Sequence, residues 1–259
     1  MKINKPNKFW LFTDGLRALL EWFSLFIYHL FKRYQKNGDG HPVLVIPGFM
    51  GSGFSTKLLR KFINKIGYHA YDWGLDRNLA NFADVEFLEI KIDELFKKHG
   101  NKITLIGWSL GGVYARQLAK AKKEKIRQVI TMGSPFNGAN EPNNARWLYE
   151  RVKAREGTPE IDPETLADLP CPAPVPTTAI YSKEDGIIPW QVCREQAEDH
   201  LHQNVRVHGS HLGFGVNPSV FYIIADRLQF QEENWQYFQP SDTLLGKFFF
   251  PREKTKTAI

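Results

Sequence analysis

The sequence predicts an α/β fold with a mainly parallel central sheet and helices on both of its faces. Short apolar segments that are typical of strands alternate along the chain with longer segments of helical periodicity. Strands in such an alternation pair in parallel, because each helix carries the chain back across the sheet. With 259 residues, 42% of them hydrophobic, the chain is long enough for one substantial core. We therefore expect one principal domain, over residues 37–246.

The segment before this domain, residues 9–31, predicts a helix with a broad apolar face. Its apolar residues recur at the i, i+3, i+4, i+7 spacing of a helix. They are Leu16, Leu19, Leu20, Phe23, Phe26, Ile27, Leu30 and Phe31. Asp14, Arg17 and Glu21 interrupt the segment, and the stretch after them has only ten residues, whereas a membrane span needs about 20. A signal peptide would need a clean apolar core and a cleavage site, so we expect the segment to stay in the mature protein.

Two interpretations of residues 1–36 stay open. The helix docks on the domain or on a second copy of the chain, or it lies in a membrane interface with aromatic rings at headgroup level and basic residues on anionic lipid. The residues suited to the second role are Trp10, Trp22, Tyr28, Lys2, Lys5, Lys8, Lys32, Arg33 and Lys36. Residues 1–36 carry a net charge of +5 and the basic tail, 247–259, carries +3, which leaves −2 for the domain. The basic charge is therefore concentrated at the two ends.

The domain opens with a strand over Val43–Ile46, whose unbroken apolar character indicates burial on both faces. A glycine-rich loop, 48–53, follows it, and the next stretch, 56–66, has helical spacing. A strand is expected over 68–73 and a helix over 82–99. The order of these elements fits the first half of a parallel sheet.

The next strand, 102–107, leads directly into a short glycine-rich turn and a helix over 113–121. A strand over 128–132 follows. Residues 137–176 are rich in proline, asparagine and charge, with one helical stretch at 145–154. We interpret this region as a short cap or lid inserted in the domain.

The last elements are strands over 177–181 and 205–207 and a closing helix over 217–228. In a parallel sheet with right-handed crossovers, the loops that follow the strands gather at one edge. Residues in these loops are therefore the candidates for a functional site.

The turn after the third strand, Gly107-Trp108-Ser109-Leu110-Gly111, matches the pattern G-x-S-x-G. A serine exposed on a sharp strand-to-helix turn needs small residues two positions to either side. The following helix directs its positive end toward the site and favours negative charge there. Because the pattern follows an apolar strand and opens a helix, it predicts that Ser109 is a nucleophile.

A serine nucleophile needs a base, and the base needs an acid that orients it. Downstream of Ser109, Asp185 follows the strand 177–181 and His211 follows the strand 205–207. The chain order Ser, Asp, His is the one that accompanies this turn. We therefore predict the triad Ser109, Asp185 and His211.

The oxyanion formed by attack on a carbonyl needs preorganised N–H donors. The backbone N–H of Leu110 is one candidate, and that of Phe49, in the loop after the first strand, is the other. Candidate walls of an apolar substrate pocket come from the same loops and from the cap, although core packing is the alternative for each. They are Gly48, Met50, Trp108, Phe136 and Trp147.

Several classes of site are not expected. No basic stripe across the domain and no motif indicates a nucleic-acid partner, and no ligand spacing indicates a metal. No phosphate-binding or dinucleotide motif is present, so no cofactor is expected. Cys171 and Cys193 are expected to be reduced thiols in a cytoplasmic protein, although one disulfide between them stays open.

The motifs together resemble those of bacterial α/β-hydrolases related to lipases and esterases, over about residues 38–230. The similar stretches are residues 40–52, 107–112, 133–138, 182–188 and 210–213, which resemble the oxyanion loop, the nucleophile turn, a strand end at the pocket, the acid loop and the histidine loop. The resemblance implies the α/β-hydrolase fold, here with an extra amino-terminal helix. Phe136 stands where many lipases carry histidine, and the cap of forty residues is short. Both departures argue against a true long-chain lipase.

We expect a hydrolase that cleaves a small acyl ester or lipid through an acyl-enzyme. Acyl transfer to another acceptor, or thioester hydrolysis, by the same triad is the alternative. A scaffold at a membrane surface, possessing the fold but no activity, is the remaining one. Contact with the inner face of a membrane, or homo-oligomerisation, would involve residues 1–36.

Overall fold

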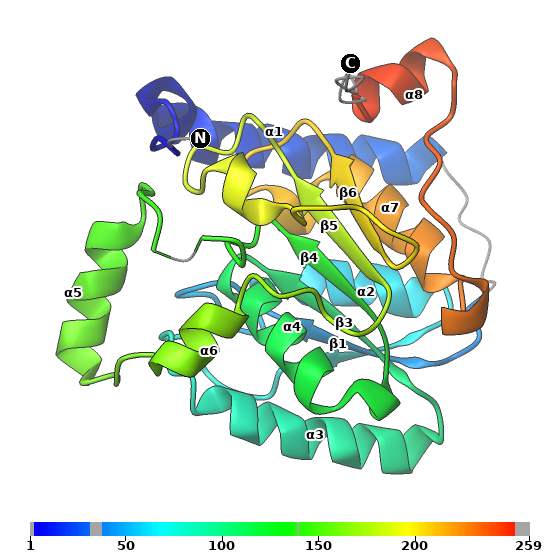
Figure 1. Ribbon diagram of the computed structural model, residues 1–259. Helices are drawn as coiled ribbons and strands as arrows, with labels where there is room; N and C mark the ends of the chain where they lie inside the picture. Colours follow the sequence, from blue (N-terminus) through cyan, green and yellow to red (C-terminus); the bar gives the residue numbers. More distant parts are fainter. Residues whose placement is uncertain (1–2, 32–37, 139, 252–259) are drawn as a thin grey trace, which may run out of the picture.

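The computed structural model describes residues 3–31, 38–138 and 140–251, and its centre is a six-stranded sheet (Figure 1). The strands are β1 (Pro42–Ile46), β2 (His69–Asp72), β3 (Ile103–Trp108), β4 (Ile126–Met132), β5 (Thr177–Tyr181) and β6 (His202–Arg206). Their order across the sheet is β2-β1-β3-β4-β5-β6, and every neighbouring pair is parallel. The predicted parallel sheet is therefore confirmed.

Helices cover both faces of this sheet. On one face lie α1 (Lys8–Phe31), α2 (Lys57–Lys65) and α7 (Pro218–Leu228), and on the other lie α3 (Asp84–His99) and α4 (Leu110–Ala121) (Figure 1). The remaining helices are α5 (Arg146–Glu156), α6 (Pro163–Asp168) and α8 (Leu244–Phe249), with short 3-10 turns at η1 (Lys123–Lys125), η2 (Trp190–Cys193), η3 (Phe214–Val216) and η4 (Glu232–Asn234). The layers match the prediction.

The core consists of two large apolar clusters separated by the sheet. Strand β1 shows the division, since Val43 and Val45 belong to one cluster and Leu44 and Ile46 to the other. Successive side chains of a strand point to opposite faces, so an unbroken apolar strand supplies both clusters. All four side chains are fully buried, as the sequence predicted.

Strand β6 differs from the prediction, because it begins at His202 rather than at residue 205. His202, at the start of the strand, is buried. Its Nδ1 lies 2.7 Å from Asp199 Oδ1 and its Nε2 lies 2.8 Å from the carbonyl oxygen of Ala173. These partners allow a polar residue to be buried in the strand. His208, beyond the end of the strand, is half-exposed, and its Nδ1 lies 3.2 Å from Glu184 Oε1.

The region 137–176 carries two helices, α5 and α6, where the sequence predicted one. Helix α6 is short and begins after Asp162, whose side chain accepts a 2.8 Å hydrogen bond from the N–H of Thr165. Asp162 therefore caps the N-terminus of this helix. Cys171 is exposed, Cys193 is buried, and both thiols are free.

Helix α1 forms as predicted and runs along the upper side of the domain (Figure 1). No helix among the described residues is long and apolar enough to cross a membrane. The side chains of Phe26–Phe31, the basic residues expected at 32, 33 and 36, Lys2, and the tail from residue 252 lie outside the described residues.

Candidate active site

Ser109 occupies the sharp turn between β3 and α4. Its φ of 52° is a left-handed conformation that is costly for a residue with a side chain. A hydrogen bond of 2.8 Å from its N–H to the carbonyl oxygen of Met132 fixes the turn. A Cβ on Gly107 would lie 2.3 Å from the carbonyl oxygen of Gly111, and one on Gly111 would lie 2.4 Å from that of Ile46. The spacing of small residues in the motif is therefore required by backbone contact.

Three loops bring together the side chains of the predicted triad. His211 Nε2 lies 3.1 Å from Ser109 Oγ, and His211 Nδ1 lies 2.6 Å from Asp185 Oδ2. A carboxylate only accepts hydrogen bonds, so Nδ1 carries a proton and the neutral ring presents Nε2 as the acceptor for the serine hydroxyl. The other carboxylate oxygen, Asp185 Oδ1, accepts 2.8 Å bonds from the N–H groups of Ile187 and Ile188.

The electrostatics of the site favour a charged imidazole. Burial of the ring opposes its charged form, but the carboxylates of Asp185 and, more weakly, Asp14 outweigh it and raise the pKa of His211 above the ordinary value. An imidazolium that forms when the ring takes a proton is therefore stabilised in place.

The predicted oxyanion loop lies against the serine turn. A Cβ on Gly48 would be 3.0 Å from Ser109 Cβ, so the glycine permits this close approach. Met50 has a φ of 62° and donates from its N–H to the carbonyl oxygen of Asn78 at 2.8 Å. Asn78 is fully buried and its Nδ2 donates to the carbonyl oxygen of Pro47 at 2.9 Å. Among the described residues, no acceptor is bound by the N–H of Phe49.

Helix α1 reaches this site with its charged residues. The buried carboxylate of Asp14 accepts hydrogen bonds from three backbone N–H groups: Gly186 at 3.1 Å, His211 at 3.0 Å and Leu212 at 2.9 Å. Asp14 thus connects the acid loop to the histidine loop. Farther along the helix, Glu21 accepts from the N–H of Ser210 at 2.7 Å.

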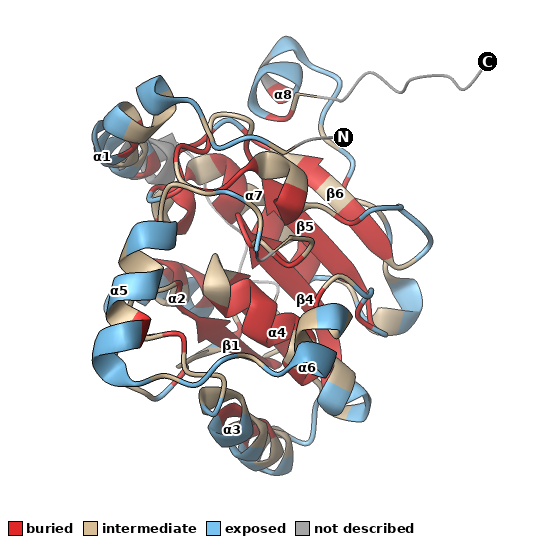
Figure 2. Cartoon of the chain, turned by 60° about the vertical axis from the view of Figure 1, so that its left-hand side comes forward, coloured by how far each residue is buried: buried red, intermediate tan, exposed pale blue. Residues whose placement is uncertain are grey.

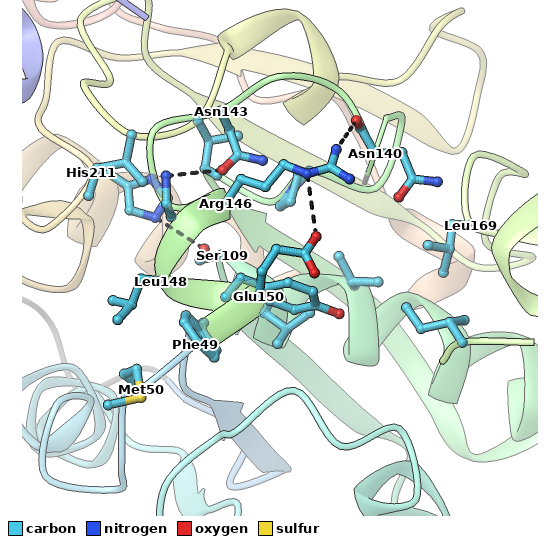
Figure 3. A pocket seen from close by; sticks show the side chains of 18 of the residues that line it. Phe49, Met50, Ser109, Asn140, Asn143, Arg146, Leu148, Glu150, Leu169 and His211 are labelled. Atoms are coloured by element: carbon cyan, nitrogen blue, oxygen red, sulfur yellow. Dashed lines mark hydrogen bonds and ion pairs between the residues drawn. The ribbon is translucent and has the colours of Figure 1, made fainter. Parts of the chain in front are cut away.

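A cavity of about 330 Å³ opens beside Ser109 and His211 (Figure 3). Its lining is mostly apolar and comes from the oxyanion loop, α4, the acid and histidine loops and the segment 137–176. Apolar residues of this lining include Phe49, Met50, Val113, Leu148, Tyr149, Leu166, Leu169, Ile187, Ile188 and Leu212. The Tyr149 ring lies 5.6 Å from that of Phe49, so α5 packs over the oxyanion loop.

Only some of the residues predicted to form the pocket wall line a cavity in the structure. Met50 lines the cavity, as does Phe49, while Gly48 and Trp108 line a smaller adjoining hollow that also includes Ser109 and His211. Phe136 is not at the wall, because it is buried beneath the guanidinium of Arg116, whose Cζ is 3.9 Å from the ring centroid. Trp147 is not there either, since it lies on the outer side of α5 and is 67% exposed.

The sequence prediction did not identify Asn78, Asp14 or Glu21 as part of the site. The two acids appeared only as interruptions of an apolar helix. Their positions, with Arg17 between them, follow helical spacing and so share one face, which is the signal that could have indicated a buried polar side. No comparable pattern marks Asn78. Within the described ranges, no group of three or more potential ligands is arranged to hold a metal ion.

Comparison with known proteins agrees with this architecture. Residues 43–243 match the model of the alpha/beta hydrolase family. The chain belongs to this family. The matched part of this α/β hydrolase begins after α1 and ends before α8.

Individual relatives of this α/β hydrolase are distant. It is 26% identical over 102 residues to a pimeloyl-[acyl-carrier protein] methyl ester esterase of Aliivibrio salmonicida, covering 39% of each chain. It is 25% identical over 131 residues to the human serine hydrolase BPHL, covering 46% of this chain and 44% of that one. The match therefore spans less than half the length of either relative.

Solved structures share the fold. An esterase of Pyrococcus furiosus superposes with a TM-score of 0.58 at 16% identity, over 76% of this chain and 84% of the other. Lipase B of Aspergillus fumigatus superposes with a TM-score of 0.54 at 17% identity, over 85% of this chain and 59% of that lipase. At these identities the likeness concerns the fold, which agrees with the resemblance predicted from the motifs.

Proposed function

We propose that this α/β hydrolase cleaves carboxylic esters through an acyl-enzyme on Ser109. The observation that carries the proposal is the continuous relay from Ser109 Oγ to His211 Nε2, at 3.1 Å, and from His211 Nδ1 to Asp185 Oδ2, at 2.6 Å. Such a relay activates a hydroxyl that is otherwise a poor nucleophile.

In the proposed reaction, His211 Nε2 takes the proton from Ser109 as Oγ bonds to the ester carbonyl carbon. The carbonyl oxygen becomes an oxyanion, for which the N–H groups of Phe49 and Leu110 are the proposed donors. The imidazolium gives its proton to the departing alkoxide, and the alcohol leaves. A water molecule then loses a proton to His211 and attacks the acyl carbon, and collapse of the second intermediate returns the proton to Ser109 and frees the acid.

The cavity supports an apolar acyl group as the part of the substrate that is bound. Its lining is dominated by aliphatic and aromatic residues, and the two charged side chains of α5 that line it are Arg146 and Glu150 (Figure 3). These two side chains are 3.4 Å apart, so their charges are paired. A volume of about 330 Å³ lies at the low end of the range for small-molecule sites, and we therefore propose a short or medium acyl chain.

The test uses a series of p-nitrophenyl esters of increasing acyl length and a fluorophosphonate probe, which reacts only with an activated serine. We expect Ser109→Ala to lose the label and to lower kcat by about 10³-fold or more. Ser241→Ala, at an exposed serine outside the site, is the matched control and should behave as the wild type. Turnover by Ser109→Ala at the wild-type rate, with the fold intact by circular dichroism, would exclude the mechanism. Product analysis with a competing alcohol or amine separates hydrolysis from acyl transfer.

A further inference from the structure

Helix α1 has its polar and apolar sides reversed relative to an ordinary surface helix. Helices at the surface of a globular protein normally bury an apolar stripe and expose charge. Here Asp14 is 2% exposed and Glu21 binds the histidine loop. Most large apolar residues of the helix are instead exposed, and the outer surface of α1 is coloured accordingly in Figure 2. The exposed ones are Phe9, Phe12, Leu16, Leu19, Leu20, Trp22 and Phe23, with exposures from 45% to 81%.

These side chains form one continuous strip. They follow the spacing of one helix face from residue 9 to residue 23, a length of about 21 Å at 1.5 Å per residue. A contiguous exposed apolar surface of this kind marks an interaction site. We call it the α1 strip.

A second exposed apolar element lies on the same side of the molecule. Helix α8 exposes Leu244, Phe248 and Phe249, and both ribbon views place it along the same edge as α1 (Figures 1 and 2). The Phe248 ring is 5.8 Å from that of His208, in the loop that leads to the catalytic-site histidine. Both helices lie outside the segment that matches the family.

The charge of the chain distinguishes between the occupants of such a surface. Residues 1–36, which include α1, carry +5, and residues 247–259, which include the second half of α8, carry +3, while the rest of the chain carries −2. Lys8 at the start of α1, Lys5 just before the helix, and Lys247 on α8 are all exposed. Two copies of this chain that met through these elements would bring like charges together, whereas an anionic bilayer offers both apolar depth and opposite charge.

The helix that carries the α1 strip also lies beside the rim of the cavity. Leu212 lines the cavity, is half-exposed, and its N–H is bound by Asp14. At the start of the helix, the carbonyl oxygen of Pro6 accepts a 3.3 Å hydrogen bond from Asn144 Nδ2, beside the cavity residue Asn143. An apolar molecule that left the bilayer at α1 would therefore meet the cavity opening.

We propose that the α1 strip, together with α8, binds this protein to the surface of an anionic lipid bilayer. Asp14 and Glu21, on the opposite side of α1, meanwhile hold the acid and histidine loops in place. Binding does not depend on the proposed esterase activity. The surface position deepens that function, because it supplies ester substrates that partition into lipid.

The experiment measures co-sedimentation of the full chain with vesicles of phosphatidylcholine, alone or mixed with phosphatidylglycerol. We expect the wild type to bind the mixed vesicles more tightly than the neutral ones, and high salt to weaken the difference. Phe12→Glu/Leu16→Glu on the strip should lower the partition coefficient by about 30-fold or more. The matched control, Phe87→Glu/Ile90→Glu, places the same charges on exposed apolar residues of α3, across the sheet, and should bind as the wild type.

Circular dichroism and fluorophosphonate labelling in solution show whether each variant is folded, so failure of the ester hydrolase proposal would not be confused with failure of this one. Binding of the wild type to neither vesicle would overturn the proposal. So would an equal loss in the α3 variant. A dimer in sedimentation velocity that the strip variant dissolves, without vesicle binding by the wild type, would assign the strip to a second copy instead.

Discussion

Replacement of Asp14 by asparagine tests whether a helix outside the segment that matches the family supports the triad. The carboxylate accepts from three backbone N–H groups with its two oxygens, and asparagine has only one acceptor oxygen, so its amide must face at least one donor. A hydrogen bond to a charged group contributes about 1.5–3 kcal/mol. With one bond lost and the others weakened, we expect the free energy of unfolding to fall by about 2–4 kcal/mol, which leaves a typical domain folded.

The same change should alter catalysis in a way that a purely structural defect would not. The charge of Asp14 helps to raise the pKa of His211, so its removal lowers that pKa and moves the acidic limb of kcat/KM to lower pH. Displacement of the two loops should also reduce kcat/KM on the alkaline plateau by about 10- to 100-fold. The assay is the pH profile of p-nitrophenyl ester hydrolysis beside urea unfolding, with the exposed Glu233→Gln as control. An unchanged limb with lowered stability would show that Asp14 only supports the fold, and the reasoning would be refuted.

Three further predictions concern the wild type and the loops around Ser109. The neutral ring of His211 is the base and its pKa is raised, so wild-type kcat/KM should fall as the pH drops through a value above the ordinary 6.5. An acidic limb of kcat/KM below pH 6.5 would contradict the inference that the nearby carboxylates outweigh burial of the ring. Gly107→Ala places a Cβ against the backbone of α4 and should lower the free energy of unfolding by about 3 kcal/mol or more. The control Gly157→Ala has open space around its Cβ but a positive φ, so it should lower that free energy by only about 1 kcal/mol. Equal midpoints of the two variants in urea unfolding would argue against the contact. Asn78→Ala should lower kcat by about 10- to 100-fold with little change in KM, and an unaltered kcat in steady-state kinetics would show that Met50 and Pro47 hold the loop without it.

The parts of the fold that the sequence predicted well are those in which one residue type has one environment. Val43–Ile46 has no polar residue to place, so burial on both faces is its only stable position. Ser109 was identified because its neighbouring glycines, a preceding strand and a following helix all serve the same turn. Asp185 and His211 were predicted from the chain order and from their positions after strands. In the structure His211 lies within hydrogen-bond distance of both Asp185 and Ser109.

The features that were missed depend on partners that sequence does not reveal. The start of β6 is polar, and it forms a strand only because Asp199 and Ala173 satisfy His202. Trp147 is an aromatic residue of the kind that lines apolar pockets, but the orientation of α5 places it on the outer side of the helix. The charged residues of α1 could be seen in the sequence. The backbone N–H groups that bind Asp14 and Glu21, however, belong to loops far along the chain. In each case the local pattern was not sufficient, and contacts with distant parts of the chain decided the outcome.

The span between Asp14 and its partners has a consequence for biogenesis. The donors that seat this carboxylate lie 172, 197 and 198 positions downstream, so the helix has no docking place until most of the polypeptide has been synthesised. Contacts of such long range form late, since closing the intervening loop is entropically costly. Until then the apolar residues of the helix remain exposed and available to bind chaperones or membranes near the ribosome. Completion of the triad's surroundings should accordingly be among the last events of folding.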